Sequence, residues 1–252
     1  MLSTASDKKH HELELEVLKN ANCILSIGKT MSDEFSEMYF KATQKKSDKF
    51  KVITNGFDDE NLGAESIIKD KKFSIAHIGT LVKDRNPEGL WKVLREIVKE
   101  NIEFENQLEI KLVGKIDIYV REQIEKYELI KYLNKIDYLP HDEVIKEQKR
   151  SKVLLLLVNN TKNAKGILTG KFFEYMASQT PVLAIGPTDG DLAQIMNETG
   201  VGVISDFNDE NTLKINILNL FNNSTQERNN LAVQNYSRKK LSEKLSLLLT
   251  EL

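Results

Sequence analysis

Lys171 and Glu174 are a cation and a carboxylate three residues apart in a stretch that predicts a helix. Both side chains share one side of the first helical turn. Free backbone N–H groups at a helix start attract phosphate, and Lys171 adds a full positive charge. Glu174 offers acceptors for the two hydroxyls of a ribose, so the pair fits a ribose and a diphosphate together. A surface ion pair on an ordinary amphipathic helix fits the local pattern about equally well.

This stretch carries a resemblance to a known family. Gly170–Ala177, followed by the apolar strand that opens at Pro181, resembles the nucleotide-sugar motif of family 4 glycosyltransferases, which have the GT-B fold. The resemblance implies that Glu174 holds the ribose of a nucleoside-diphosphate sugar, with Thr169 and Gly170 at the helix start as further donor-binding candidates. It also implies retention at the sugar carbon. A metal is usually not essential in the family, so we expect no metal site and no cofactor beyond the donor substrate.

The composition is that of an ordinary globular protein. The chain has 252 residues, of which 40% are hydrophobic and 29% charged, and its net charge is −2. This balance gives no support to a nucleic-acid or membrane-surface partner. Cys23 is the only cysteine, which excludes a disulfide within the chain and suits a reducing compartment. Because the sequence has no apolar run of membrane-spanning length and no signal-peptide pattern, we expect a cytoplasmic protein.

Apolar strands alternate with amphipathic helices along most of the chain. The predicted strands are Phe73–Gly79, Leu108–Gly114, Ile136–Leu139, Lys152–Val158, Pro181–Ile185 and Val201–Ser205. Helices are predicted from Pro87, over 117–133, over 140–150, from Gly170, around Leu192 to Met196, and over Asn211–Phe221. The alternation predicts an α/β fold with a Rossmann-like, doubly wound parallel sheet, which the resemblance identifies as the C-terminal domain of a GT-B enzyme.

The residues before this sheet look like the tail of another domain. After an irregular start over residues 1–9, we predict a helix over His10–Ala21, a strand over Cys23–Gly28, and a helix that Thr30 caps. Lys51–Asp58 then resembles the family segment that leads from the N-terminal into the C-terminal domain. A plain hairpin at Asn55 and Gly56 is the alternative.

These landmarks predict three parts. Residues 1–49 are the tail of the N-terminal domain and a linker, and residues 50–222 are the nucleotide-sugar-binding domain, with a loop over Asn61–Lys72. Residues 223–252 are C-terminal helices that cross back toward the N-terminal domain. Most of an N-terminal domain is therefore missing from the chain.

The loop after the first strand of the sheet is the second predicted part of the site. The family pattern here is Gly, Arg, Leu, three variable residues, Lys and Gly, in which the Arg and the Lys bind the donor diphosphate. Gly79 and Leu81 match, and Arg85 keeps the charge at the Lys position. Thr80 stands at the Arg position, where Lys83 is near enough to substitute.

Three further segments supply candidates. The family often has two Glu residues eight positions apart, but the first of them falls on Gly166, so Asn160, Asn163 or Lys165 is left to contact the donor sugar. In the family the loop after the third strand lies on the nucleotide base, which makes Leu139, Pro140 and His141 candidates. His77 is expected to be a core histidine. Asp189 or Asp191 is expected to cap the next helix rather than to bind a metal.

The sequence therefore supports one main function and two alternatives. The main hypothesis is the donor-binding half of a glycosyltransferase, in which Arg85, Lys171 and Glu174 act on the donor. The acceptor is unknown: a glycan, a lipid-linked sugar or a small molecule. We expect the chain to be inactive without its missing domain. The alternatives are a non-catalytic nucleotide-binding or regulatory module, and a nucleotide-sugar epimerase of the same fold.

Overall fold

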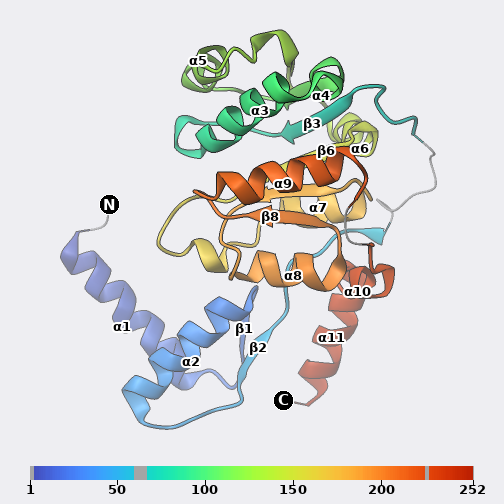
Figure 1. Ribbon diagram of the computed structural model, residues 1–252. Coiled ribbons are helices and arrows are strands. Elements are labelled where there is room, and N and C mark those ends of the chain that lie inside the picture. Colours follow the sequence, from blue (N-terminus) through green and yellow to red (C-terminus); the bar gives the residue numbers. More distant parts are fainter. Residues whose placement is uncertain (1–2, 60–66, 225–226, 252) are drawn as a thin grey trace.

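A six-stranded parallel sheet forms the centre of the molecule (Figure 1). The structure is a computed structural model, and it describes residues 3–59, 67–224 and 227–251. The strand order is β5-β4-β3-β6-β7-β8, with every neighbouring pair parallel. The strands are β3 (Phe73–Ile78), β4 (Leu108–Val113), β5 (Leu133–Ile136), β6 (Val153–Leu157), β7 (Val182–Ile185) and β8 (Gly202–Ser205). The predicted doubly wound parallel sheet is confirmed.

Helices cover both faces of this sheet. One face packs on α3 (Glu88–Glu100), α4 (Ile102–Gln107), α5 (Ile118–Lys126) and α9 (Glu210–Phe221). The other face packs on α6 (His141–Arg150), α7 (Gly170–Ala177), α8 (Asp191–Thr199) and α10 (Asn230–Gln234). The unbroken apolar run of β6 follows from this arrangement, because Leu155 and Leu157 enter the first core while Leu154 and Leu156 enter the second.

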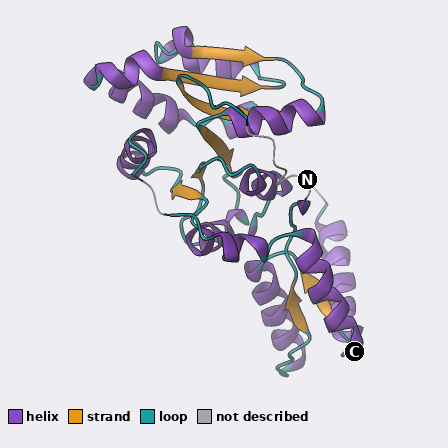
Figure 2. Cartoon of the chain, turned by 90° about the vertical axis from the view of Figure 1, so that its right-hand side faces the viewer, coloured by secondary structure: helices purple, strands orange, loops and turns teal. Residues whose placement is uncertain are grey.

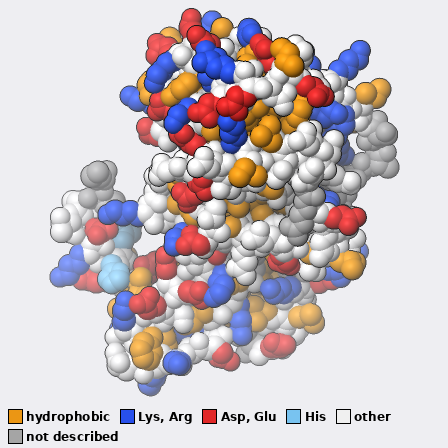
Figure 3. Space-filling model, viewed as in Figure 1, with side chains coloured by type: hydrophobic (Ala, Val, Ile, Leu, Met, Phe, Trp, Pro, Cys, Tyr) orange, Lys and Arg blue, Asp and Glu red, His pale blue; other side chains and the backbone are white. Residues whose placement is uncertain are grey.

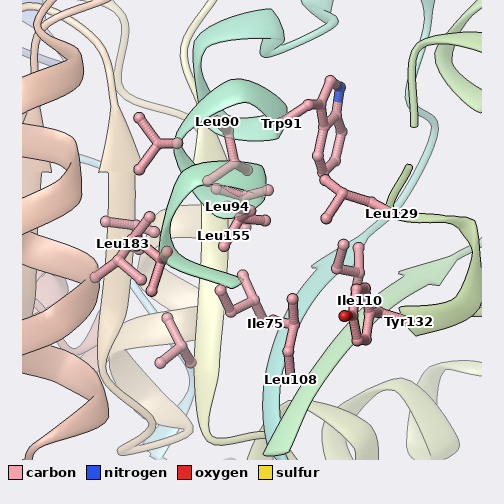
Figure 4. Packing of buried hydrophobic residues seen from close by; sticks show 14 of the residues in the cluster. Ile75, Leu90, Trp91, Leu94, Leu108, Ile110, Leu129, Tyr132, Leu155 and Leu183 are labelled. Atoms are coloured by element: carbon pink, nitrogen blue, oxygen red, sulfur yellow. The ribbon is translucent and has the colours of Figure 1, made fainter. Parts of the chain in front are cut away.

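The α3 side of the core shows how the helices are fixed on the sheet. Leu90, Trp91 and Leu94 of α3 project from one side of the helix into the cluster that includes Ile75 and Leu155 of the strands (Figure 4). Trp91 and Leu94 are completely buried. This packing fixes α3, and with it the loop that connects β3 to α3.

The order of the strands reverses between β3 and β6. From β3 the chain builds outward to β4 and β5, and it then returns to place β6 on the other side of β3. β3 pairs with β4 from Phe73 to Ile78, but it pairs with β6 only at Ile75 and Ala76. The two central strands therefore separate toward their carboxyl ends, which is where doubly wound sheets bind ligands.

A smaller lobe lies below the large sheet in Figure 1. It contains α1 (Thr4–Asn20), β1 (Ile24–Ser26), α2 (Lys29–Thr43) and β2 (Phe50–Val52), and we call residues 3–52 the N-terminal unit. Its two strands form a separate parallel sheet, which Figure 2 shows among helices. The last helix, α11 (Arg238–Thr250), returns to this unit, where Lys244 Nζ donates to the carbonyl oxygen of Val52 at 3.1 Å.

Two chain segments cross between the lobes and bind each other. The Phe57 N–H donates to the Tyr236 carbonyl at 3.1 Å, and the Arg238 N–H donates to the Phe57 carbonyl at 2.8 Å. Arg238 also pairs with Asp58 at 2.9 Å. The crossing segments are thus joined by backbone and side-chain contacts.

Several predicted elements were wrong. The segment 117–133 is not one helix, because α5 ends at Lys126 and Glu128 takes a left-handed conformation (φ 58°). The next strand is therefore Leu133–Ile136, and the predicted strand Ile136–Leu139 is wrong. The start of the chain is also regular: α1 begins at Thr4, with Ser3 accepting a hydrogen bond from the Ser6 N–H. Residues 61–66 of the predicted loop Asn61–Lys72 lie outside the described residues.

Two predicted helix caps were also wrong. Gly28, not Thr30, is the N-cap of α2. Gly190 is the N-cap of α8, with no side-chain cap from Asp189 or Asp191. Instead, Asp189 pairs with Lys165 at 2.6 Å, and Asp191 bonds to Thr30 in the N-terminal unit. The residue types indicated that these side chains form polar contacts, but the sequence did not identify their partners.

Candidate functional site

The loops after β3 and β6 meet at the carboxyl edge of the sheet, on either side of the point where the strand order reverses. The first loop begins at Gly79, whose φ of +124° is one that other residues rarely adopt. Its N–H donates to the Val113 carbonyl at 2.8 Å, and the Leu81 N–H donates to Lys115 at 2.9 Å. Leu81 is completely buried. The loop after β3 is therefore anchored to the loop after β4.

Lys171 reaches across from α7 to this glycine. A Cβ atom on Gly79 would lie 2.7 Å from Lys171 Nζ, so the missing side chain of Gly79 leaves the space that the ammonium group occupies. The structure thus brings together Gly79 and Lys171, two residues that the sequence placed in the same site.

Lys171 and Arg85 are the cations of this site. Among the described residues, the side chains of Lys171 and Arg85 form no hydrogen bond and no ion pair. Burial lowers the pKa of Lys171, the positive charge of Arg85 lowers this pKa further, and Glu174 opposes the change. Two cations that repel each other at the edge of a parallel sheet form a site of positive potential that an anion would stabilise.

The start of α7 adds an open, polar surface. A Cβ atom built on Gly170 meets nothing within 4 Å, so the space in front of the helix is free. Thr169 is the N-cap, but its side chain forms no capping hydrogen bond, and its buried Oγ1 has no partner among the residues that the structure describes. The positive end of the helix dipole therefore faces open space next to Lys171.

Glu174 and His141 line the same recess between α6 and α7, together with Ile145, Gln148, Ala177 and Ser178. Glu174 is half-buried, and within the described ranges its carboxylate has no hydrogen-bond or ion-pair partner. Pro140 precedes α6 as its N-cap, and the half-buried Leu139 packs on the core beneath. The base and ribose candidates therefore lie together beside α7.

Four further candidate residues are Thr80, Lys83, Asn160 and Lys165. Thr80 is exposed and supplies no charge. Lys83 Nζ lies over the ring of Tyr119 at 4.9 Å, a cation–π contact that holds it toward α5. Asn160 and Arg85 line one cavity of about 260 Å³ at the ends of β6 and β7. Lys165 is paired with Asp189, as described above.

Two buried side chains shape the opening between β3 and β6: His77, which the sequence predicted to be a core histidine, and Tyr175, which sequence reasoning missed. His77 is 2% exposed, and its Nδ1 lies 3.2 Å from the Leu155 carbonyl oxygen of β6. The hydroxyl of the fully buried Tyr175 accepts a hydrogen bond from the Ile78 N–H at 3.2 Å. These contacts use backbone groups near the position where ladder pairing between β3 and β6 stops. His77 lies in the core as expected, but its Nε2 has no partner in the described part of the chain.

The pKa of His77 is strongly perturbed. Burial lowers its pKa from 6.5 to about 4, and the positive charge of Lys171 contributes to the change. Because a charged imidazole would lose hydration and meet the Lys171 ammonium, His77 is neutral at physiological pH. His77 therefore contributes a hydrogen bond to Leu155 near the loop after β3, and it does not add a third positive charge to the site.

Charges over the rest of the molecule are mixed. On the face that Figure 3 shows, acidic and basic side chains are interspersed over both lobes. No helix within the described ranges is long and apolar enough to cross a membrane. Within the same ranges, no group of three or more His, Cys, Asp or Glu residues is placed to hold a metal ion.

The fold is that of solved GT-B glycosyltransferases. Sucrose-phosphate synthase from Thermosynechococcus elongatus aligns with a TM-score of 0.68 and 16% identity, over 100% of this chain and 64% of that one. A glycosyltransferase from Rickettsia africae aligns with a TM-score of 0.71 and 14% identity, over 99% and 67%. The pneumococcal O-GlcNAc transferase GtfA, in complex with UDP and GlcNAc, aligns with a TM-score of 0.68 and 16% identity, over 96% and 47%.

The sequence also identifies the family. Residues 58–240 match the sequence model of the Glycosyl transferases group 1 family, and the chain belongs to this family. The curated proteins compared with the chain include no match. The chain spans 64% of the length of the sucrose-phosphate synthase and 47% of that of GtfA.

Proposed function

We propose that this chain is the donor-binding part of a retaining glycosyltransferase that uses a nucleoside-diphosphate sugar. The observation that carries the proposal is a pair of cations, Lys171 and Arg85, beside Gly79 and the open start of α7, which form no hydrogen bond or ion pair among the residues that the structure describes. A diphosphate would neutralise both cations and accept hydrogen bonds from the helix start. GtfA, which shares the fold, was solved with UDP and GlcNAc, and this supports the same class of ligand here.

Each candidate residue has a distinct role in this proposal. Lys171 and Arg85 stabilise the negative charge that develops on the leaving nucleoside diphosphate when the bond to the sugar breaks. Glu174, one helical turn from Lys171, accepts hydrogen bonds from the ribose hydroxyls. His141 and the backbone before it border the base. No step in this scheme requires a metal ion.

The small N-terminal unit bears on where an acceptor binds. The N-terminal unit has only two parallel strands, and a parallel sheet of this kind is normally larger and covered on both faces. We propose that an N-terminal domain completes this unit and supplies the acceptor site, and that the chain alone transfers no sugar, because transfer requires both reactants to be held together. The single, half-buried Cys23 suits a cytoplasmic location.

Two alternatives differ from this proposal in turnover. A nucleotide-binding or regulatory module would bind the diphosphate without turnover even with an N-terminal domain present. An epimerase would convert a nucleotide sugar without any acceptor.

Titration calorimetry with UDP, GDP and ADP tests the proposal. Glu174→Ala should remove charged hydrogen bonds to the ribose and lower affinity roughly tenfold to a hundredfold, for a loss of about 1.5–3 kcal/mol. Lys171→Ala and Arg85→Ala should weaken binding of the diphosphate far more than binding of the matching nucleoside. Lys131→Ala, which removes the same charge from a remote surface pair with Glu105, is the matched control.

The outcomes separate the roles. Equal losses for nucleoside and diphosphate in Lys171→Ala would contradict the phosphate assignment. An unchanged affinity in Glu174→Ala would contradict the ribose assignment. If none of the three diphosphates binds the wild-type chain, the proposal that this chain binds the donor by itself is wrong.

A further inference from the structure

A buried carboxylate joins the large domain to the N-terminal unit. Asp191 is the first residue of α8 and is 6% exposed. Its Oδ1 accepts hydrogen bonds from the Thr30 N–H at 3.1 Å and from the Thr30 hydroxyl at 2.9 Å. Its Oδ2 lies 3.1 Å from the same N–H. Thr30 is the second residue of α2. One side chain of the large domain therefore accepts hydrogen bonds from the start of a helix in the N-terminal unit.

The carboxylate of Asp191 is held by the N–H and hydroxyl donors of Thr30. Across residues 3–59, 67–224 and 227–251, it forms no ion pair with a Lys, an Arg or a His. It lies instead at the amino ends of two helices, its own α8 and the α2 of the N-terminal unit. Each end carries a partial positive charge and free N–H groups, which favour a carboxylate. The contact therefore depends on α2 being held in this position and orientation.

Glycines lie where three segments approach one another, and at Gly28 and Gly190 there is no room for a side chain. A Cβ on Gly28, just before α2, would lie 2.2 Å from Asp191 Oδ2. A Cβ on Gly190, just before α8, would lie 2.6 Å from the Lys165 carbonyl oxygen. A Cβ on Gly166 would lie 3.4 Å from Thr30 Cβ and Cγ2. The starts of α2 and α8 thus pack against the loop between β6 and α7.

That loop is the one that leads into the proposed donor site. It runs from Asn159 to Thr169, includes the candidate sugar contacts Asn160, Asn163 and Lys165, and ends at the start of α7. Lys165 is held at its other side by Asp189, only two residues before Asp191. The loop is therefore enclosed between α2 and the residues just before α8, and the position of α2 limits how the loop can lie.

We propose that Asp191 is a positioning residue of the donor site, which holds the start of α2 against the β6–α7 loop and so keeps the loop in its sugar-binding form. The crossing segments at Phe57 and Tyr236 join the two lobes at a different place, and a rotation of the N-terminal unit about them would break its contact with Asp191. The bond from Asp191 to Thr30 opposes that rotation. The sugar-binding part of this inference rests on the proposed function, whereas the coupling between α2 and the loop does not.

Hydrogen exchange followed by mass spectrometry tests the coupling without any ligand. Asp191→Asn keeps the shape of the side chain but removes its charge, and it should make exchange roughly tenfold faster both at the start of α2 and over residues 159–168. Thr30→Val removes only the hydroxyl and should act in the same direction, while Thr30→Ser should resemble wild type. Thr30→Val also serves as the main test if Asp191→Asn does not fold.

A matched variant controls for the loss of a helix-end carboxylate. Asp117 accepts a hydrogen bond from the Tyr119 N–H at the start of α5, away from the N-terminal unit. Asp117→Asn should speed exchange at α5 and leave residues 159–168 unchanged. If Asp191→Asn speeds exchange in α2 but not in residues 159–168, Asp191 is merely a helix cap and the proposal is wrong.

Binding then tests the positioning role itself. The probes are UDP with UDP-glucose, GDP with GDP-mannose and ADP with ADP-glucose. For any pair that binds, Asp191→Asn should weaken the sugar nucleotide several-fold more than the diphosphate, because the loop contacts the sugar. Equal weakening of both would refute the positioning role. If no probe binds wild type, the donor proposal fails, and the exchange experiment still decides whether α2 and the loop are coupled.

Discussion

The buried, neutral His77 should make the stability of the protein depend on pH in a way that one substitution removes. His77 lies in the core next to the candidate site. Its Nδ1 contacts the Leu155 carbonyl oxygen, and its Nε2 has no partner in the described part of the chain. His77→Gln keeps a side-chain N–H group for Leu155 and removes the titration.

The magnitude follows from the pKa values. The pKa of His77 falls from 6.5 to about 4 on folding, with burial as the main cause and Lys171 as the next. Between these values the unfolded chain binds a proton that the native chain does not, so stability is lost as the pH falls from 6.5 toward 4. A difference of about 2.5 in pKa corresponds to about 3 kcal/mol.

Urea unfolding from about pH 7 down to about pH 4.5 measures this effect as the difference in unfolding free energy between wild type and His77→Gln. Relative to the variant, the wild type should lose stability steadily over this range. His11→Gln, which removes an exposed histidine of α1, is the control and should leave the wild-type dependence intact. A difference between wild type and His77→Gln that stays constant with pH would refute the reasoning.

Two further substitutions probe the scaffold of the site. Gly79→Ala forces a side chain onto a φ of +124° and against Lys171 Nζ, so we expect a loss of about 1–3 kcal/mol in unfolding free energy together with weaker diphosphate binding. Gly170→Ala, with open space around its Cβ, is the stability control. Lys111→Met removes the buried partner of Asp70 (2.6 Å) and Glu147 (2.5 Å) and should cost about 3–5 kcal/mol in thermal unfolding. A loss no larger than that from Lys131→Met at the surface would contradict this.

The sheet could be predicted from the sequence because the patterns that indicate its strands are local. The apolar runs of β3, β4, β6 and β7 have strand length, and a sheet covered on both faces requires such runs without alternation. Once the strands are parallel, their carboxyl ends share one edge. The loops at Gly79 and Gly170 therefore had to meet, and the contact of Lys171 with Gly79 could be expected in outline.

The features that sequence reasoning missed depend on tertiary contacts. Asp191 had every local property of a helix cap, yet the donors that it satisfies belong to Thr30, 161 positions away. The strand predicted at Ile136–Leu139 was wrong because Glu128 ends α5 early, and a left-handed glutamate has no strong sequence signal. A residue type can reveal that a hydrogen bond is needed without revealing which segment provides the partner.

The helix α7 shows how one short stretch both builds the site and keeps it open. Lys171 and Glu174 are the only residues of α7 after Gly170 that remain partly exposed. Their spacing of three places them on the side of α7 that faces the candidate site. Tyr175, the next residue, points into the sheet, where its hydroxyl accepts the Ile78 N–H. Because β6 does not pair with β3 at that position, the tyrosine satisfies a strand-end donor while the strands stay apart. The residues proposed to contact the ligand and the group that satisfies the end of β3 are thus fixed by the same helix, so a change in the orientation of α7 would alter both together.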